Sequence, residues 1–225
     1  MLIASDGSAY QKARVFMLCC RYSLFAEAGG YSYTTTMLYT RKGDDGTSGL
    51  FGSKERLPKD CPLFEALGTV DELNSLLGVC FAKANEKNYT NIAELLRSVQ
   101  QDLFIVQAEL AGADKKLDQP HVEKLEAAIA ELEQKFDNPQ SFVIAGGSEL
   151  SALLDYARAV SRRAEREAIA MRSTNDASDT AGTVTIQKPL SAETRQYLNR
   201  LSSFLYALAR FANTLASSAE QKPTY

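Results

Sequence analysis

The sequence predicts an all-α protein, a five-helix antiparallel bundle preceded by an N-terminal glycine-rich loop. Five segments carry apolar residues at intervals of three and four positions, as one face of an α-helix requires. Strand signals are few, and the one short β-branched run, Thr183–Ile186, lies in a polar stretch that we expect to be a long loop over 173–190. With 225 residues, 45% of them hydrophobic, the chain is long enough for one packed domain.

The boundaries of the expected helices follow from the apolar stripes and from residues that favour a helix start. Pro120 suits the first turn of the third helix, and Ser148 is placed to cap the fourth. The last helix follows Pro189 and ends near Leu215. The expected ranges of the first four are 63–84, 91–111, 120–136 and 148–168.

The bundle and its loop are expected to occupy residues 37–218, and 219–225 a flexible tail. Residues 1–36 match no later pattern and are interpreted as a disordered, dispensable extension. The other interpretations are an organelle-targeting peptide, a secretory signal, or a start codon placed too early, with Met37 as the true start. Four cysteines without a CxxC pair indicate a reducing compartment. We therefore expect a cytoplasmic protein, or a mitochondrial matrix protein if residues 1–36 are a transit peptide.

The overall charge argues against two classes of partner. The net charge is −3, so no general basic field attracts nucleic acid or an anionic membrane surface. No apolar run approaches the roughly 20 residues of a membrane helix. Any site for an anion must therefore be local.

The segment TRKGDDGTSGLFG, from Thr40 to Gly52, has glycine at every third position. It is neither a Walker A sequence nor a dinucleotide fingerprint, because it lacks both the Gly-Lys-Ser/Thr ending and a strand–turn–helix context. Such loops are more often simple connections. Here the neighbouring cations favour anion binding through backbone N–H groups and side chains together; they are Arg41, Lys42, Lys54, Arg56 and Lys59.

The fourth helix carries Arg158, Arg162 and Arg166 at intervals of four, on one face. Glu165 lies beside them and Arg163 is turned away. A solvated basic face is the alternative interpretation. Three arginines on one face repel one another unless an acid or an anion neutralises them, and guanidinium groups suit phosphate.

Two further polar features lie on expected helices. Asp71 belongs to a polar stripe on the first helix, and Thr69 to Glu72 fits a capping box. Asp71 is thus either a first-turn acid or a partner for an arginine. In the last helix Asn199 and Arg200 interrupt the apolar pattern, which suggests a hydrogen-bonding role or simply an exposed surface.

Several kinds of catalytic centre are missing from the sequence. His121 is the one histidine, so the two Glu-x-x-His units of a di-iron centre are excluded, and no zinc cluster is present. His121 itself is expected to be exposed. No protein nucleophile is evident. If the protein is an enzyme, a substrate or cofactor must bring the reactive atom.

Four segments, LYTRKGDDGTSGLFG, PKDCPLFEALGTVDELNSLLG, FVIAGGSELSALLDYARAVSRRAERE and YLNRLSSFLYALARFAN, together resemble the PduO-type ATP:corrinoid adenosyltransferases. The resemblance runs in order from Met37 to about Asn213. It implies transfer of the 5′-deoxyadenosyl group of ATP to the cobalt of cob(I)alamin, which forms adenosylcobalamin and releases triphosphate. It also implies Mg²⁺ with the ATP, a homotrimer with active sites between subunits, and as partners a cobalamin reductase and an adenosylcobalamin-dependent enzyme.

The resemblance also implies roles for individual residues. Asp71 and Arg158 would pair across the subunit interface, Phe142 would close the lower face of the corrin, and Arg162 would complete this catalytic set. ATP would be bound by Thr40, Arg41, Lys42, Gly43, Ser48, Lys59, Arg162, Arg163, Ala164, Glu165, Arg166 and Asn199. The chain departs from the family pattern at Ala145, where proline is usual, and at Ser203, where aspartate is usual. A non-catalytic helical carrier of corrinoid or ATP is the alternative function, and a bundle without a ligand is a third.

Overall fold

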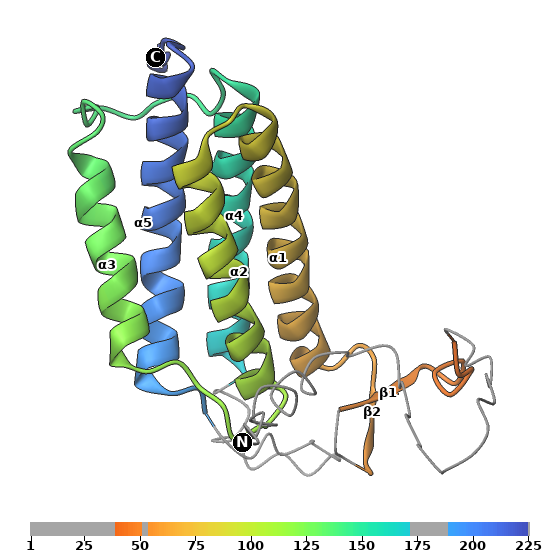
Figure 1. Ribbon diagram of the computed structural model, residues 1–225. Coiled ribbons are helices and arrows are strands. Elements are labelled where there is room, and N and C mark those ends of the chain that lie inside the picture. Colours follow the sequence, from red (N-terminus) through yellow and green to blue (C-terminus); the bar gives the residue numbers. More distant parts are fainter. Residues whose placement is uncertain (1–38, 51–53, 172–188, 225) are drawn as a thin grey trace, which may run out of the picture. The chain divides into compact units, whose positions relative to one another are not determined.

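The computed structural model describes residues 39–50, 54–171 and 189–224. The chain divides into two compact units, residues 1–59 and 60–225, and each is described by itself. The second unit contains five helices (Figure 1). They are α1 (Pro62–Glu86), α2 (Thr90–Leu110), α3 (Gln119–Glu133), α4 (Glu149–Ala170) and α5 (Ala192–Leu215).

The five helices form a bundle in which successive helices alternate in direction, as Figure 1 shows. α4 packs against both α1 and α5, α1 also packs against α2, and α3 packs mainly on α5. The predicted all-α bundle is confirmed. Its core is built from the predicted apolar stripes; Leu73, Leu77, Leu103, Leu154 and Leu205 are each fully buried.

The helix starts follow their capping residues. The Ser148 side chain accepts a hydrogen bond from the Ser151 backbone N–H, so the predicted cap of α4 is confirmed. Pro120 lies in the first turn of α3, as predicted, and Asp118 caps that helix. Ser191 caps α5 by accepting from the Thr194 N–H.

The interpretation of Thr69 to Glu72 as a helix start is wrong. α1 begins at Pro62 behind Cys61, so Thr69 lies inside the helix. Its hydroxyl donates instead to Glu167 of α4. Asp71 is therefore not a first-turn acid; it lies exposed in the middle of α1.

The first unit contains a small hairpin that the sequence did not indicate. β1 (Thr47–Gly49) pairs antiparallel with β2 (Arg56–Pro58), with Ser48 opposite Leu57. Strands of three residues are too short to show an alternating pattern. The run Thr183–Ile186 and the extension 1–36 lie outside the described residues, as does most of the expected loop 173–190.

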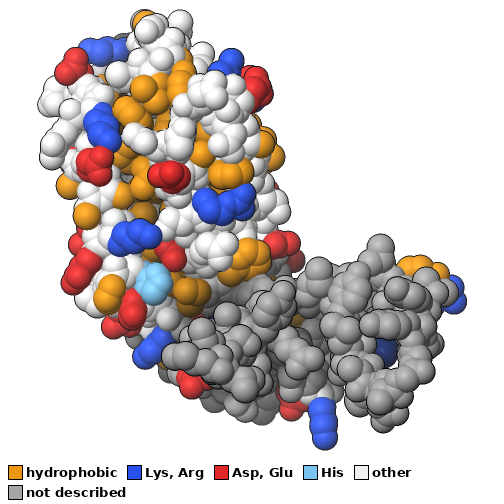
Figure 2. Space-filling view, viewed as in Figure 1, with side chains coloured by type: hydrophobic (Ala, Val, Ile, Leu, Met, Phe, Trp, Pro, Cys, Tyr) orange, Lys and Arg blue, Asp and Glu red, His pale blue; other side chains and the backbone are white. Residues whose placement is uncertain are grey.

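No helix in the described ranges is both long and apolar enough to cross a membrane. On the face of the bundle seen in Figure 2, acidic and basic side chains are interspersed with hydrophobic ones. Neither positive nor negative side chains predominate on this face.

Candidate functional site

The glycine loop is held in shape by its own side chains. Arg56 on β2 donates from Nε to Thr47 Oγ1 at 2.7 Å and from Nη2 to the Thr47 carbonyl at 2.9 Å. The same guanidinium also donates to the Lys42 carbonyl. Asp45 accepts from the Thr47 N–H and hydroxyl, at 3.0 and 2.7 Å. Arg56 thereby connects both ends of the turn, and the loop has a defined backbone.

Two glycines of the loop are explained by this geometry. Gly46 has φ of +80°, which favours glycine. At Gly43 an added Cβ would lie 3.0 Å from Lys59 Nζ and 3.2 Å from the Thr47 carbonyl oxygen. Lys59 Nζ occupies that space and donates to the Gly43 carbonyl at 2.7 Å. The loop thus has a lysine ammonium fixed against its backbone.

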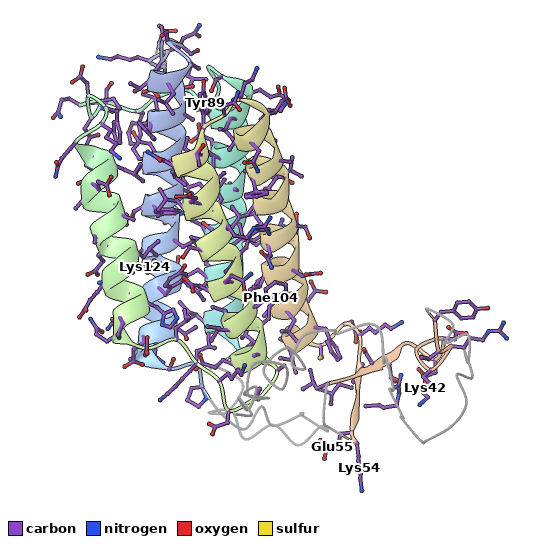
Figure 3. The ribbon with its side chains drawn as sticks, viewed as in Figure 1. Lys42, Lys54, Glu55, Tyr89, Phe104 and Lys124 are labelled. Atoms are coloured by element: carbon purple, nitrogen blue, oxygen red, sulfur yellow. The ribbon has the colours of Figure 1, made fainter. Side chains whose placement is uncertain are left out.

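The other predicted loop residues lie around the same turn. Thr40, Arg41 and Lys42 are exposed, and Ser48 is half-buried on β1. Arg41 has φ of +57°, an uncommon conformation for a residue other than glycine. Its guanidinium lies 5.4 Å from the centre of the Tyr39 ring. The side chain of Lys42, labelled in Figure 3, extends from the loop and is exposed, so its charge remains available to an anion.

The predicted arginine face of α4 is present in the bundle. Arg162 and Arg166 are exposed, and none of the described acidic groups lies within ion-pair distance of either guanidinium. Arg158 is half-buried, with Nε 4.0 Å from Asp155 Oδ1. Two of the three arginines therefore carry positive charge that the described part of the chain leaves uncompensated.

The intervening residues of α4 have different surroundings. Arg163 forms an ion pair with Glu72 of α1. Ala164 is fully buried, so its side chain packs in the core. Glu165 Oε1 accepts from Asn199 Nδ2 of α5 at 3.0 Å. Asn199 therefore has a hydrogen-bonding role between two helices.

Asp71 and Arg158 do not contact each other within one chain. Asp71 Oδ1 accepts a long hydrogen bond, 3.4 Å, from Gln107 of α2. The Nε of Arg158 is buried without a hydrogen-bond acceptor among the described residues. The Asp71 side chain and the remainder of the Arg158 side chain are accessible from outside the chain.

Phe142 lies on the connection between α3 and α4, and its side chain is 80% exposed. Ile144 on the same connection is 51% exposed. Exposure of two large apolar side chains so close together is unusual and is typical of a contact surface for an apolar ligand or partner.

A buried polar network near this connection was not predicted from the sequence. Arg210 of α5 is 2% exposed and donates from Nη2 to Asp155 Oδ2 of α4 at 2.7 Å. Its Nε lies 2.9 Å from Glu220 Oε1. One signal for it existed: Arg210 occupies an apolar position of α5 between Ala209 and Phe211, where a charged residue requires a buried partner.

A second polar cluster is formed by Asp102 of α2, His121 of α3 and Tyr197 of α5. Tyr197 is fully buried and donates to Asp102 Oδ2 at 2.8 Å. Burial, and then the Asp102 charge, raise the pKa of Tyr197 well above its usual value of 10. Burial likewise raises the pKa of Asp102. His121 Nε2 lies 3.8 Å from Asp102 Oδ1, and the side chain is partly exposed.

The described residues hold no group of three or more His, Cys, Asp or Glu side chains arranged for a metal ion. What the described groups supply is cationic and backbone donors for an anion, together with an exposed apolar loop.

Comparison with known proteins gives one consistent result. The family model "Cobalamin adenosyltransferase" matches residues 38–212. A corrinoid adenosyltransferase of Citrobacter freundii is 39% identical over 184 residues, which are 79% of this chain and 95% of that protein. The corrinoid adenosyltransferase PduO of Salmonella typhimurium is 35% identical over 81% of this chain, which spans 51% of that longer protein.

A solved structure shows the same fold. It is a variant PduO-type ATP:corrinoid adenosyltransferase from Lactobacillus reuteri, complexed with cobalamin and ATP. The TM-score is 0.72 at 28% identity, and the match covers 84% of this chain and 100% of the other.

Proposed function

The chain belongs to the cobalamin adenosyltransferase family, and from this premise we propose that it transfers the 5′-deoxyadenosyl group of ATP to the cobalt of cob(I)alamin. The products are adenosylcobalamin and triphosphate. The observation that carries the proposal beyond family membership is the pair of exposed guanidinium groups, Arg162 and Arg166, which no described acid neutralises.

The reaction needs no nucleophile from the protein. The cobalt(I) electron pair attacks C5′ of ATP, a cobalt–carbon bond forms, and the C5′–O bond breaks. Triphosphate leaves with the bonding electrons. The protein's task is to hold the nucleotide in line with the corrinoid and to stabilise the charge that grows on the leaving oxygen.

The residues proposed for ATP fall into two sets. On the glycine loop, the backbone around Gly43 and the side chains of Lys42 and Lys59 suit phosphate oxygens. On α4, Arg162 and Arg166 offer bidentate donors to further phosphate oxygens. Thr40, Arg41, Ser48, Arg163, Ala164, Glu165 and Asn199 are proposed to line the nucleotide site or to hold it in shape.

Mg²⁺ is proposed to enter as the ATP complex. Because the described residues form no cage of three ligands, the metal would be coordinated chiefly by triphosphate oxygens and water. Its contribution would be to neutralise charge on the leaving group.

The corrinoid is proposed to lie against Phe142. An apolar ring beneath the corrin excludes a lower axial ligand, which makes reduction to cobalt(I) easier. The 80% exposure of the Phe142 side chain makes it available for that contact.

A homotrimer with sites between subunits is proposed from Asp71 and Arg158. The Asp71 side chain is exposed, and the Arg158 side chain is 38% exposed. An ion pair between neighbouring subunits would satisfy both. Asp71→Ala and Arg158→Ala should each lower the trimer fraction in light scattering.

A cobalamin reductase and an adenosylcobalamin-dependent enzyme are the protein partners proposed, as the suppliers of cobalt(I) and the consumers of the product. The cytoplasm is the proposed compartment, with the mitochondrial matrix as the alternative. Mass spectrometry of the mature N-terminus in cells distinguishes the two.

The function is tested by supplying cob(II)alamin, a reductant and Mg-ATP. We expect the absorbance spectrum of adenosylcobalamin together with stoichiometric triphosphate. Binding of ATP and corrinoid without either product would contradict the transferase and support a carrier. Failure to bind ATP in calorimetry would contradict both.

A further inference from the structure

The connection that bears Phe142 is attached to the bundle by the residues that follow α5. The backbone N–H of Ile144 donates to the Gln221 carbonyl at 2.8 Å. Phe142 lies just before this bond in the chain. The segment after α5, residues 216–224, turns back through Ser217, whose φ is +50°, so that Gln221 reaches the connection.

Asn213 is the centre of this attachment. It is 2% exposed, and its side-chain amide makes hydrogen bonds through both of its polar atoms. Oδ1 accepts from the Ser148 N–H at 2.9 Å, while Nδ2 donates to the Gly146 carbonyl at 3.2 Å and to Glu220 Oε1 at 3.0 Å. One side chain therefore joins the end of the connection, the N-cap of α4 and the segment after α5.

The approach is close enough to restrict the sequence. At Gly147, φ is +93°, and an added Cβ would lie 2.7 Å from the Asn213 side-chain oxygen. Glycine is thus required here by both backbone conformation and space. The contact between Asn213 and the connection is a packed one, because no larger residue fits at Gly147.

Glu220 connects Asn213 to the buried ion pair. Its Oε1 accepts from Asn213 and lies 2.9 Å from Arg210 Nε, and Arg210 in turn is paired with Asp155. A charged group buried in this way has few alternative arrangements, since any other leaves the Arg210 charge without its partners. The network therefore gives the connection one preferred position.

From these contacts we infer that Asn213 and Glu220 are positioning residues for Phe142. They fix the connection so that the exposed side chains of Phe142 and Ile144 are presented to the corrinoid without a large ordering cost on binding. The role assigned to Phe142 rests on the proposed function; the attachment itself does not.

The variants are chosen to separate positioning from folding. Asn213→Ala removes all the hydrogen bonds of the side-chain amide. Glu220→Gln lies outside the helices and keeps an oxygen acceptor for Asn213, but removes the charge that faces Arg210. Lys222→Ala, an exposed residue shortly after Glu220, is the matched control.

Hydrogen exchange tests the attachment. In Asn213→Ala and Glu220→Gln, exchange of the Ile144 amide, which donates to the Gln221 carbonyl, should accelerate by about ten-fold or more, which corresponds to about 1.4 kcal/mol, the scale of one hydrogen bond. The control should exchange like the parent protein. Unchanged protection in both variants would overturn the inference. If Asn213→Ala does not fold, hydrogen exchange in Glu220→Gln alone tests whether the attachment fixes the connection.

Kinetics test the consequence for the reaction. KM for the corrinoid should rise by about ten-fold while KM for ATP stays within about two-fold, because only the Phe142 contact is disturbed. In a Phe142→Ala background, Asn213→Ala should add little, since both changes act on one contact. Equal changes in both KM values, or additive effects, would overturn the positioning role. A parent protein that makes no adenosylcobalamin would instead contradict the proposed function, and hydrogen exchange would still decide on the attachment.

Discussion

Arg210 of α5 and Asp155 of α4 form an ion pair of 2.7 Å whose side chains are only 2% and 7% exposed. The pair lies at the most extensive helix–helix contact of the bundle. Asp155→Ala should lower the free energy of unfolding by about 3 kcal/mol, because it leaves a buried guanidinium without its main acceptor. Urea denaturation measures this loss. The exposed control Glu133→Gln should stay within about 0.5 kcal/mol of the parent protein.

A second substitution separates charge from packing at this pair. The double variant Asp155→Leu with Arg210→Met removes both charges together and should be more stable than Asp155→Ala alone. Equal stability of the two would mean that the cost comes from lost contacts and not from the uncompensated charge.

Arg162→Ala should lose most turnover, about a hundred-fold or more, while its circular dichroism and unfolding midpoint stay unchanged. The fold should not change, because Arg162 is exposed and pairs with no described acid, so its charge serves no structural ion pair in the described chain. Turnover should fall, because this charge is proposed to stabilise the leaving triphosphate. The measurement is the rate of adenosylcobalamin formation. Arg162→Lys should recover only part of the rate, because an ammonium lacks the planar fork of donors. Near-normal activity of the alanine variant would remove Arg162 from the mechanism.

Arg56→Ala should raise KM for ATP by about ten-fold. Arg56 holds the glycine loop through Thr47 and Lys42, and without it the loop must be ordered by the nucleotide itself. Steady-state kinetics and calorimetry both measure the effect. Lys54→Ala, an exposed neighbour in the same segment (Figure 3), is the control and should bind ATP normally. A ten-fold loss in the control as well would point to general electrostatics.

The stability of the bundle should fall as pH rises above 10, in part through Tyr197. Burial raises the pKa of Tyr197 in the folded chain above its usual value of 10, so the unfolded chain releases this proton first. The stabilisation is complete below pH 10 and is lost as pH rises toward the folded pKa. Tyr197→Phe should cost about 1 kcal/mol at pH 7, from the lost bond to Asp102, yet show a weaker decline above pH 10.

The comparison is urea denaturation at pH 7 and at pH 10.5. Tyr156→Phe is the matched control, since it removes the hydroxyl of a tyrosine that is 55% exposed. If Tyr197→Phe and the parent protein lost the same stability between these pH values, the ionisation of Tyr197 would not contribute.

The sequence predicted the helices well because each buries a long stripe whose period is visible. The starts of α3 and α4 were also accessible through Pro120 and Ser148, whose local chemistry favours a helix start. For α5 the sequence analysis named only Pro189, whereas the capping residue is Ser191. The start of α1 was not accessible, since Cys61 makes no side-chain cap and Thr69 imitates one.

Contacts between distant segments could not be predicted in the same way. The bonds from Asn213 to Gly146 and Ser148 join positions 65 to 67 residues apart and have no local pattern. The same holds for Arg56, which the sequence offered as one cation among several and which the structure places on the backbone of the loop. Sequence periodicity reports burial of one face, whereas these side chains act on neighbours that only the folded chain brings close.

The unequal packing of α3 has a consequence for native-state motion. Because α3 packs mainly on α5, it can detach without dismantling the other four helices, and a partial opening of this kind costs less free energy than global unfolding. Such an opening would uncover Leu132 and Phe211 to water long before the rest of the bundle melts. The resistance of the molecule to proteases and to aggregation then depends on such local openings as well as on its total stability.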